Sequence, residues 1–252
     1  MYRSGNPALN DLTFEKSAYK EVSWWEDSES NLMSMNGVVD KTALLLTIVT
    51  LTAIAVYLTV PISLFLSLLG AIVGFVVALI IIFSGSMNPI LICTYAACQG
   101  LFLGGITWII EKQVDAPGLG ILAAVLTFLI LGVMLSIYRA GLISWNKNMQ
   151  IAVTSSMVAI LLIYLVSFIG SFVGFEVPLI HGNGAVGIAF SVFVVGIASL
   201  CLVADFDFIE RGVERGAPKQ LEWRAAFGLL VTLIWLYLEI LKLLAKLVAS
   251  NR

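Results

Sequence analysis

Long apolar segments constrain this chain more than any other feature of its sequence. Nearly uncharged runs of about 20 residues recur along it, and short polar stretches with glycine, proline or charged residues separate them. Hydrophobic residues make up 60% of the 252 and charged residues only 12%, whereas soluble globular proteins carry about 25% charged residues. One core of this size cannot hide so much apolar surface, so the expected solvent is lipid.

The apolar runs predict an all-α polytopic membrane protein with seven transmembrane helices. The expected spans are 42–60, 61–83, 90–110, 119–138, 150–175, 185–208 and 225–247. Almost no turn separates the first two, and Pro61 is expected to begin the second because proline is favoured at the first helical position. We therefore expect a polar N-terminal segment, residues 1–41, followed by a seven-helix membrane domain, residues 42–252.

Lysine and arginine near the span ends predict a cytoplasmic N-terminus and an external C-terminus. The stretches 139–147 and 211–224 and Lys41 carry most of these charges, and seven spans place them on one side. The predicted location is the bacterial cytoplasmic membrane. The net charge of −2 gives no indication of a nucleic-acid partner. The segment 1–41 is acidic, and it is either a flexible tail or a docking arm for a partner protein.

No motif of a common enzyme class occurs in the chain. HExxH, GxSxG and the P-loop are absent, and the single histidine, His181, lies in a glycine-rich loop. Cys93, Cys98 and Cys201 lie in apolar runs without a CxxC spacing, so no metal ligands are identified. We expect no catalytic activity and no cofactor, and an intramembrane protease with paired carboxylates is the remote alternative.

Two aspartates stand where the sixth apolar run ends. Asp205 and Asp207 are two residues apart, so on a helix they project about 200° from each other. Asp207 precedes Arg211 by four residues, a favourable spacing for an ion pair, and it is expected at the start of the solvated loop. Asp205 has apolar neighbours and is expected to be buried in the bundle.

Glu239 is the most deeply placed acid of the seventh run, and such a charge costs about 2.5–3.5 kcal/mol in mid-bilayer. Two interpretations stay open. In the first, Glu239 pairs within its own helix with Lys242, and Lys246 shares the same stripe. In the second, Glu239 meets Asp205, and two carboxyl groups in contact share a proton because both cannot be ionised in a low dielectric. Such a pair would be a proton-sensitive latch.

Several stretches together resemble the Bax inhibitor-1/YccA (TMBIM) family, bacterial branch with a long N-terminal extension. The similarity lies in "ADFDFIE" followed by "LYLEILKLL", and in "YAACQGLFLGGIT" (95–107), "NPALNDLTF" (6–14), "MNGVVDKTALLL" (35–46) and "APKQLEWRAAFGLLVTLIWLYLEILKLL" (217–244). The order and spacing of these stretches cover nearly the whole chain.

The resemblance implies a last helix enclosed by the first six and a proton-sensitive Ca²⁺ leak gated by a di-carboxyl pair, which maps onto Asp205 and Glu239. It also implies an alternative, a non-channel modulator of a membrane-bound AAA protease of the FtsH kind or of a stress factor. Two departures matter. Gln99 replaces the acid common in the third-span motif, and the second span ends without basic residues, which leaves Arg139 as a candidate partner of the latch.

Overall fold

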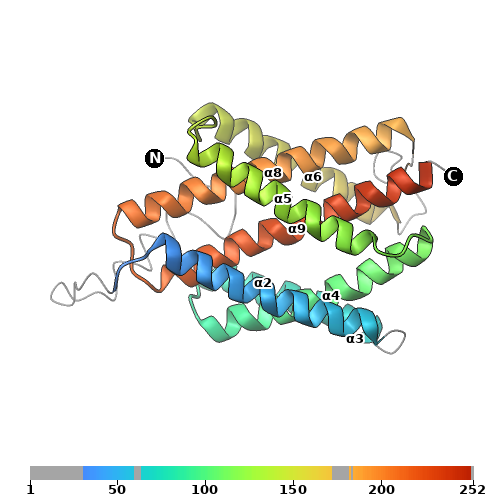
Figure 1. Cartoon of the computed structure of the whole chain (residues 1–252), viewed down its shortest axis with the longest axis horizontal. Coiled ribbons are helices and arrows are strands. Elements are labelled where there is room, and N and C mark those ends of the chain that lie inside the picture. Colours follow the sequence, from blue (N-terminus) through green and yellow to red (C-terminus); the bar gives the residue numbers. More distant parts are fainter. Residues whose placement is uncertain (1–30, 60–63, 172–181, 183, 251–252) are drawn as a thin grey trace. The chain divides into compact units, whose positions relative to one another are not determined.

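The computed structural model describes residues 31–59, 64–171, 182 and 184–250 (Figure 1). Seven helices in these ranges are long and apolar enough to cross a membrane. They are α2 (Met35–Leu58), α3 (Leu64–Ser84), α4 (Pro89–Gln113), α5 (Leu119–Arg139), α6 (Lys147–Ser171), α8 (Ala185–Glu214) and α9 (Leu221–Ser250). Apart from one isolated bridge, the regular structure of the described residues is helical, which confirms the predicted all-α polytopic fold.

The chain divides into two compact units. Unit 1 contains Met1–Ile109 and Ala204–Val231, and unit 2 contains Ile110–Val203 and Thr232–Arg252. Three helices (α4, α8 and α9) therefore contribute one part to each unit. The predicted boundary between a polar segment and a membrane domain at residue 41 is a different division, which the described residues do not test.

Several helices extend beyond the apolar runs that predicted them. The first helix begins at Met35 rather than near Thr42, because the side chain of Ser34 caps it by accepting the Gly37 N–H at 3.0 Å. The α4 helix begins at Pro89, and the Asn88 side chain accepts the Ile90 N–H at 2.9 Å. The expected start of the second span at Pro61 lies outside the described residues.

Small residues let α2 and α4 approach closely in unit 1. A Cβ added at Gly100 would collide with the Thr52 hydroxyl and the Val49 carbonyl of α2, and one at Gly104 would collide with the Ala53 carbonyl. The two glycines are four residues apart and lie on one face of α4, the spacing that supports close helix packing in membranes. Close packing is thus the role of the glycines in "CQGLFLGG".

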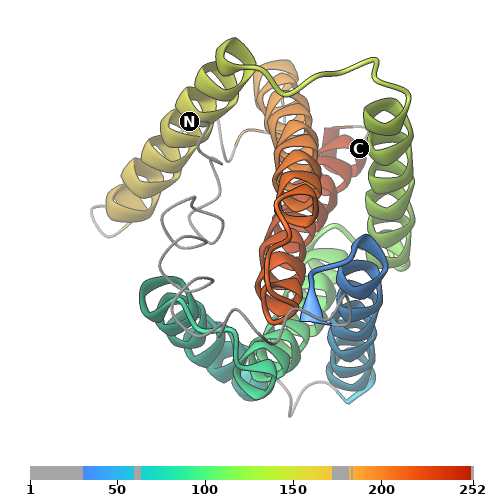
Figure 2. The same ribbon diagram turned by 90° about the vertical axis from the view of Figure 1, so that its left-hand side faces the viewer.

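The connection between α8 and α9 pairs with the segment before α2, also within unit 1. The Met33 N–H donates to the Ala217 carbonyl at 2.7 Å, and the Lys219 N–H donates to the Asn31 carbonyl at 2.8 Å. Figure 2 faces this end, where the blue start of α2 lies beside the orange-red connection. Apolar side chains, among them Met33 and Leu221, form a buried cluster beneath it.

Burial differs strongly between the helices. In the most apolar window of α9, 61% of the residues are buried, against 17% for α5 and for α6. Large apolar side chains such as Phe75 of α3 and Phe168 of α6 are exposed, which a helix surface tolerates where lipid covers it. Among the seven described helices, α9 has the highest share of buried residues in its apolar window.

Candidate functional site

Asp205 is a completely buried carboxyl group in α8. Its exposed fraction is 0%, and its sequence neighbours Ala204 and Phe206 are exposed by only 5% each. The prediction that this aspartate is buried is confirmed. A carboxylate removed from water needs hydrogen bonds, an opposite charge or a proton to offset its desolvation. The desolvation of Asp205 therefore has to be offset in one of these three ways.

Asp207 has a different environment from Asp205. It forms the predicted ion pair with Arg211, four residues later, and its side chain remains 17% exposed. The expectation that Asp207 begins the solvated loop was wrong, because α8 continues to Glu214. The Arg211 guanidinium donates to the Asp207 carbonyl as well, at 3.2 Å, and this contact supports the extra helical turns.

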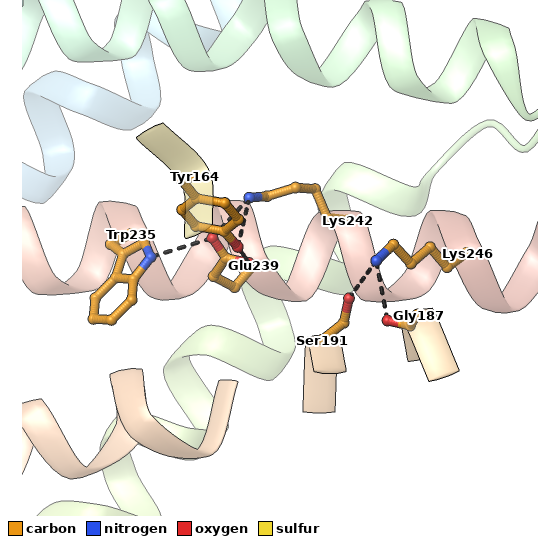
Figure 3. A network of polar contacts seen from close by, with 7 residues as sticks. All are labelled: Tyr164, Gly187, Ser191, Trp235, Glu239, Lys242 and Lys246. Carbon is orange, nitrogen blue, oxygen red and sulfur yellow. Dashed lines mark hydrogen bonds and ion pairs between the residues drawn. The ribbon is translucent and has the colours of Figure 1, made fainter. Parts of the chain in front are cut away.

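Glu239 is 2% exposed and lies at the centre of a polar network in unit 2 (Figure 3). Its Oε1 accepts from the Lys242 ammonium at 2.7 Å and from the Trp235 indole N–H at 3.2 Å. Its Oε2 accepts from the Tyr164 hydroxyl of α6 at 2.8 Å. The ion pair within the helix, one of the two predicted interpretations, is thus present, and the two aromatic donors are additional partners.

Two lysines follow Glu239 on α9, and they differ in exposure. The Lys242 side chain is 39% exposed, and its ammonium lies 4.7 Å from the centre of the Tyr164 ring. Lys246 is only 9% exposed, and it donates to the Gly187 carbonyl at 3.0 Å and to the Ser191 hydroxyl at 2.8 Å. The stripe of Glu239, Lys242 and Lys246 therefore carries two positive charges for one negative charge.

The hydrogen bonds of Glu239 all have the same direction. Three groups donate hydrogen bonds to its two oxygens, and an ionised carboxylate can only accept. A proton on Glu239 would add a fourth donor and remove the charge that holds Lys242. At least one contact of Tyr164, Trp235 or Lys242 would then have to change. The Glu239 carboxyl group thus connects Tyr164 of α6 with Lys242 of α9.

The two remaining candidates, Gln99 and Arg139, lie in unit 1 and unit 2 respectively. Gln99 is half-buried in α4 and packs near Gly74 of α3, where an added Cβ would meet its amide nitrogen at 3.2 Å. Arg139 is exposed in the last turn of α5, where a positive charge favours the helix end. The predicted role of Arg139 as a partner of the latch stays a prediction.

Other predicted features have no described position or no ligand geometry. His181 lies outside the described residues, as does most of the N-terminal segment 1–41. Across the part of the chain that the structure describes, no three histidine, cysteine or acidic side chains gather closely enough to hold a metal ion.

Sequence reasoning missed two further buried carboxylates among the described residues, Glu111 of α4 and, more completely enclosed, Glu222 in the first turn of α9. Glu222 is 0% exposed and pairs with Lys41 of α2. It also accepts from the Ser34 backbone N–H at 2.9 Å and from the Ser34 hydroxyl at 3.1 Å. A Cβ at Gly37 would collide with this carboxylate. The one signal in the sequence is that Ser34, Gly37 and Lys41 share one helix face by their spacing.

These features define the class of the protein: an all-α, multi-pass membrane protein with buried carboxyl groups in its helices. A family model described as Bax inhibitor 1 like matches residues 6–249, which is nearly the whole chain. The chain belongs to the Bax inhibitor 1 like family, as its motifs predicted. No curated protein matches it.

Proposed function

We propose that this protein is a proton-sensitive cation leak of the Bax inhibitor-1 type that conducts Ca²⁺. The observation that supports the proposal best is the burial of Asp205 and Glu239, which are 0% and 2% exposed in helices of predominantly apolar sequence. Ionisable groups inside membrane segments are costly, and they commonly mark ion or proton pathways.

In this proposal the carboxyl groups of Asp205 and Glu239 are coupled, so that the two titrate together as a pair. Gain or loss of one proton shifts the population between two packings of the helices, and the ion path is open in one of them. Aspartate and glutamate are suited to the role because their oxygens accept a proton and are also the ligands that Ca²⁺ prefers. Lipid, Ca²⁺ and protons are the partners that the proposal requires.

The contacts of Glu239 suggest how its protonation affects the helices that it connects. Lys242 and Tyr164 donate hydrogen bonds to the Glu239 carboxyl group. When Glu239 takes up a proton, Lys242 loses its counter-charge and Tyr164 loses the stronger, charge-assisted acceptor. Because Tyr164 belongs to α6 and Lys242 to α9, the proton changes the bond between these two helices.

The ion pair between Glu239 and Lys242 also favours a second function. A carboxylate that Lys242 neutralises inside its own helix needs no role in conduction, so the protein would act as a non-channel modulator of a membrane-bound AAA protease or stress factor. We propose no catalytic activity in either case. We further propose the bacterial cytoplasmic membrane as the location, with the N-terminus in the cytoplasm, from the distribution of lysine and arginine.

The test is Ca²⁺ flux from liposomes that contain only the purified protein, measured across pH. A leak should release Ca²⁺ without any partner protein, and its rate should change with pH. The matched control is Asp207→Asn, which removes a carboxylate two residues from Asp205 that is already paired at a more exposed position. Absence of flux at every pH, in protein that is folded and inserted, would favour the modulator.

A further inference from the structure

Lys246 is a buried cation near the end of α9 in unit 2. It is only 9% exposed, although a lysine four residues before the end of a helix is long enough to extend its ammonium into water. The ammonium is instead directed to the start of α8, where it donates to the Gly187 carbonyl at 3.0 Å and to the Ser191 hydroxyl at 2.8 Å (Figure 3). These two contacts hold the charge inside the unit.

The neighbouring helices of unit 2 do not neutralise this charge. Both acceptors of Lys246 are neutral oxygens, and the part of α8 that belongs to unit 2, residues 185–203, has no charged residue in its sequence. The single charged residue of α6 is Lys147, at its first position. Glu239 of α9 already forms an ion pair with Lys242 at 2.7 Å. The stripe on α9 therefore carries one excess positive charge when Glu239 is ionised and two when it is protonated.

Lys246 lies between Glu239 and the C-terminal end of α9. Seven residues separate the two side chains along the helix, which corresponds to about 10 Å of rise. In the proposed leak, a cation that moves between Glu239 and the water at this end of α9 passes the Lys246 ammonium. Like charges repel each other, and salt screens a buried charge less than an exposed one.

We propose that Lys246 is a charge barrier, meaning a fixed positive charge that slows the passage of cations and slows divalent cations most. The inference rests on the proposed leak and adds to it a residue that determines which ions pass. The Coulomb energy is proportional to the charge of the ion, so Ca²⁺ meets twice the barrier that K⁺ meets. At about 10 Å and a water-like dielectric constant, one unit charge slows Ca²⁺ about fourfold and K⁺ about twofold.

The test measures Ca²⁺ flux and K⁺ flux in liposomes that contain the purified full-length protein, at one pH. Glutamine at position 246 keeps an amide donor for Gly187 and Ser191 but removes the charge. Lys246→Gln should therefore raise Ca²⁺ flux about fourfold and K⁺ flux about twofold. Lys246→Arg keeps the charge and should retain both wild-type fluxes. The matched control is Lys147→Gln, an exposed lysine of the same unit, which should leave both fluxes unchanged.

The ratio of the two increases separates a charge effect from a structural effect. A variant that only loosens helix packing should raise both fluxes by the same factor, and this result for Lys246→Gln would overturn the barrier. Wild-type fluxes in Lys246→Gln, or equal effects of Lys246→Gln and Lys246→Arg, would also overturn it while the leak itself stands. Absence of flux from wild type and from every variant is a different result, because it would contradict the leak and the barrier together.

Discussion

Glu239→Gln, made alone and together with Lys242→Met, probes the polar network of unit 2 most sharply. Glutamine keeps a carbonyl oxygen for the Tyr164 hydroxyl but removes the charge that holds Lys242. Hydrogen bonds to charged groups contribute about 1.5–3 kcal/mol, and breaking a buried ion pair costs about 3–5 kcal/mol. The Lys242 side chain is 39% exposed and regains water in the variant, so the cost is lower.

We therefore expect Glu239→Gln to lower the free energy of unfolding by about 2 kcal/mol. Lys242→Met should cost about 3 kcal/mol, because it leaves a buried carboxylate with only the two aromatic donors. The double variant removes both charges, so its loss should fall below the sum of the single losses by about 1–3 kcal/mol. The assay is reversible unfolding in mixed micelles, followed by the circular dichroism of the helices.

The matched control is again Asp207→Asn, whose ion pair with Arg211 is partly exposed and should contribute about 0.5 kcal/mol. The reasoning about the network fails if Glu239→Gln is no more destabilising than this control. It also fails if the losses of the two single variants simply add in the double variant, since additivity means that Glu239 and Lys242 do not interact.

Three further predictions concern other buried groups. Gly100→Ala should lower the free energy of unfolding by about 1–3 kcal/mol because its Cβ overlaps α2, whereas Gly132→Ala, with open space around it, should be neutral or stabilising in the same unfolding assay. Glu222→Gln should cost about 3 kcal/mol in that assay and leave the pH profile of Ca²⁺ flux unchanged; a flattened profile would contradict the separate role of Glu222. In a background without native cysteines, Asp207→Cys should react faster with an impermeant thiol reagent than Asp205→Cys, and equal rates would contradict the burial of Asp205.

The sequence was sufficient for features that depend on one helix at a time. The seven apolar runs predicted the helices because the membrane requires long apolar segments. The ion pairs of Asp207 with Arg211 and of Glu239 with Lys242 were predictable because spacings of three or four residues place side chains on one face. The extension of α8 to Glu214 was missed because a charged stretch can continue a helix into water.

Contacts between distant segments were beyond the reach of the sequence. Tyr164 is 75 residues from Glu239, and Lys41 is 181 residues from Glu222, so no local spacing connects them. Only the packing of helices brings a tyrosine of α6 to a glutamate of α9. For the same reason, burial of Asp205 could be predicted from its apolar neighbours, whereas the contacts of Glu222 with Ser34 and Lys41 could not.

The central proposal is that the carboxyl groups of Asp205 and Glu239 titrate as a coupled pair and thereby control Ca²⁺ flux. The most direct test is the pH profile of flux in liposomes for Asp205→Asn, Glu239→Gln and the double variant, with wild type and Asp207→Asn in parallel. Amides cannot titrate, so each single variant should flatten the profile, and the double variant should add little because both changes disrupt the same unit. Asp207→Asn should retain the wild-type profile. An unchanged profile in both single variants, in folded protein, would contradict the account and favour the non-channel modulator.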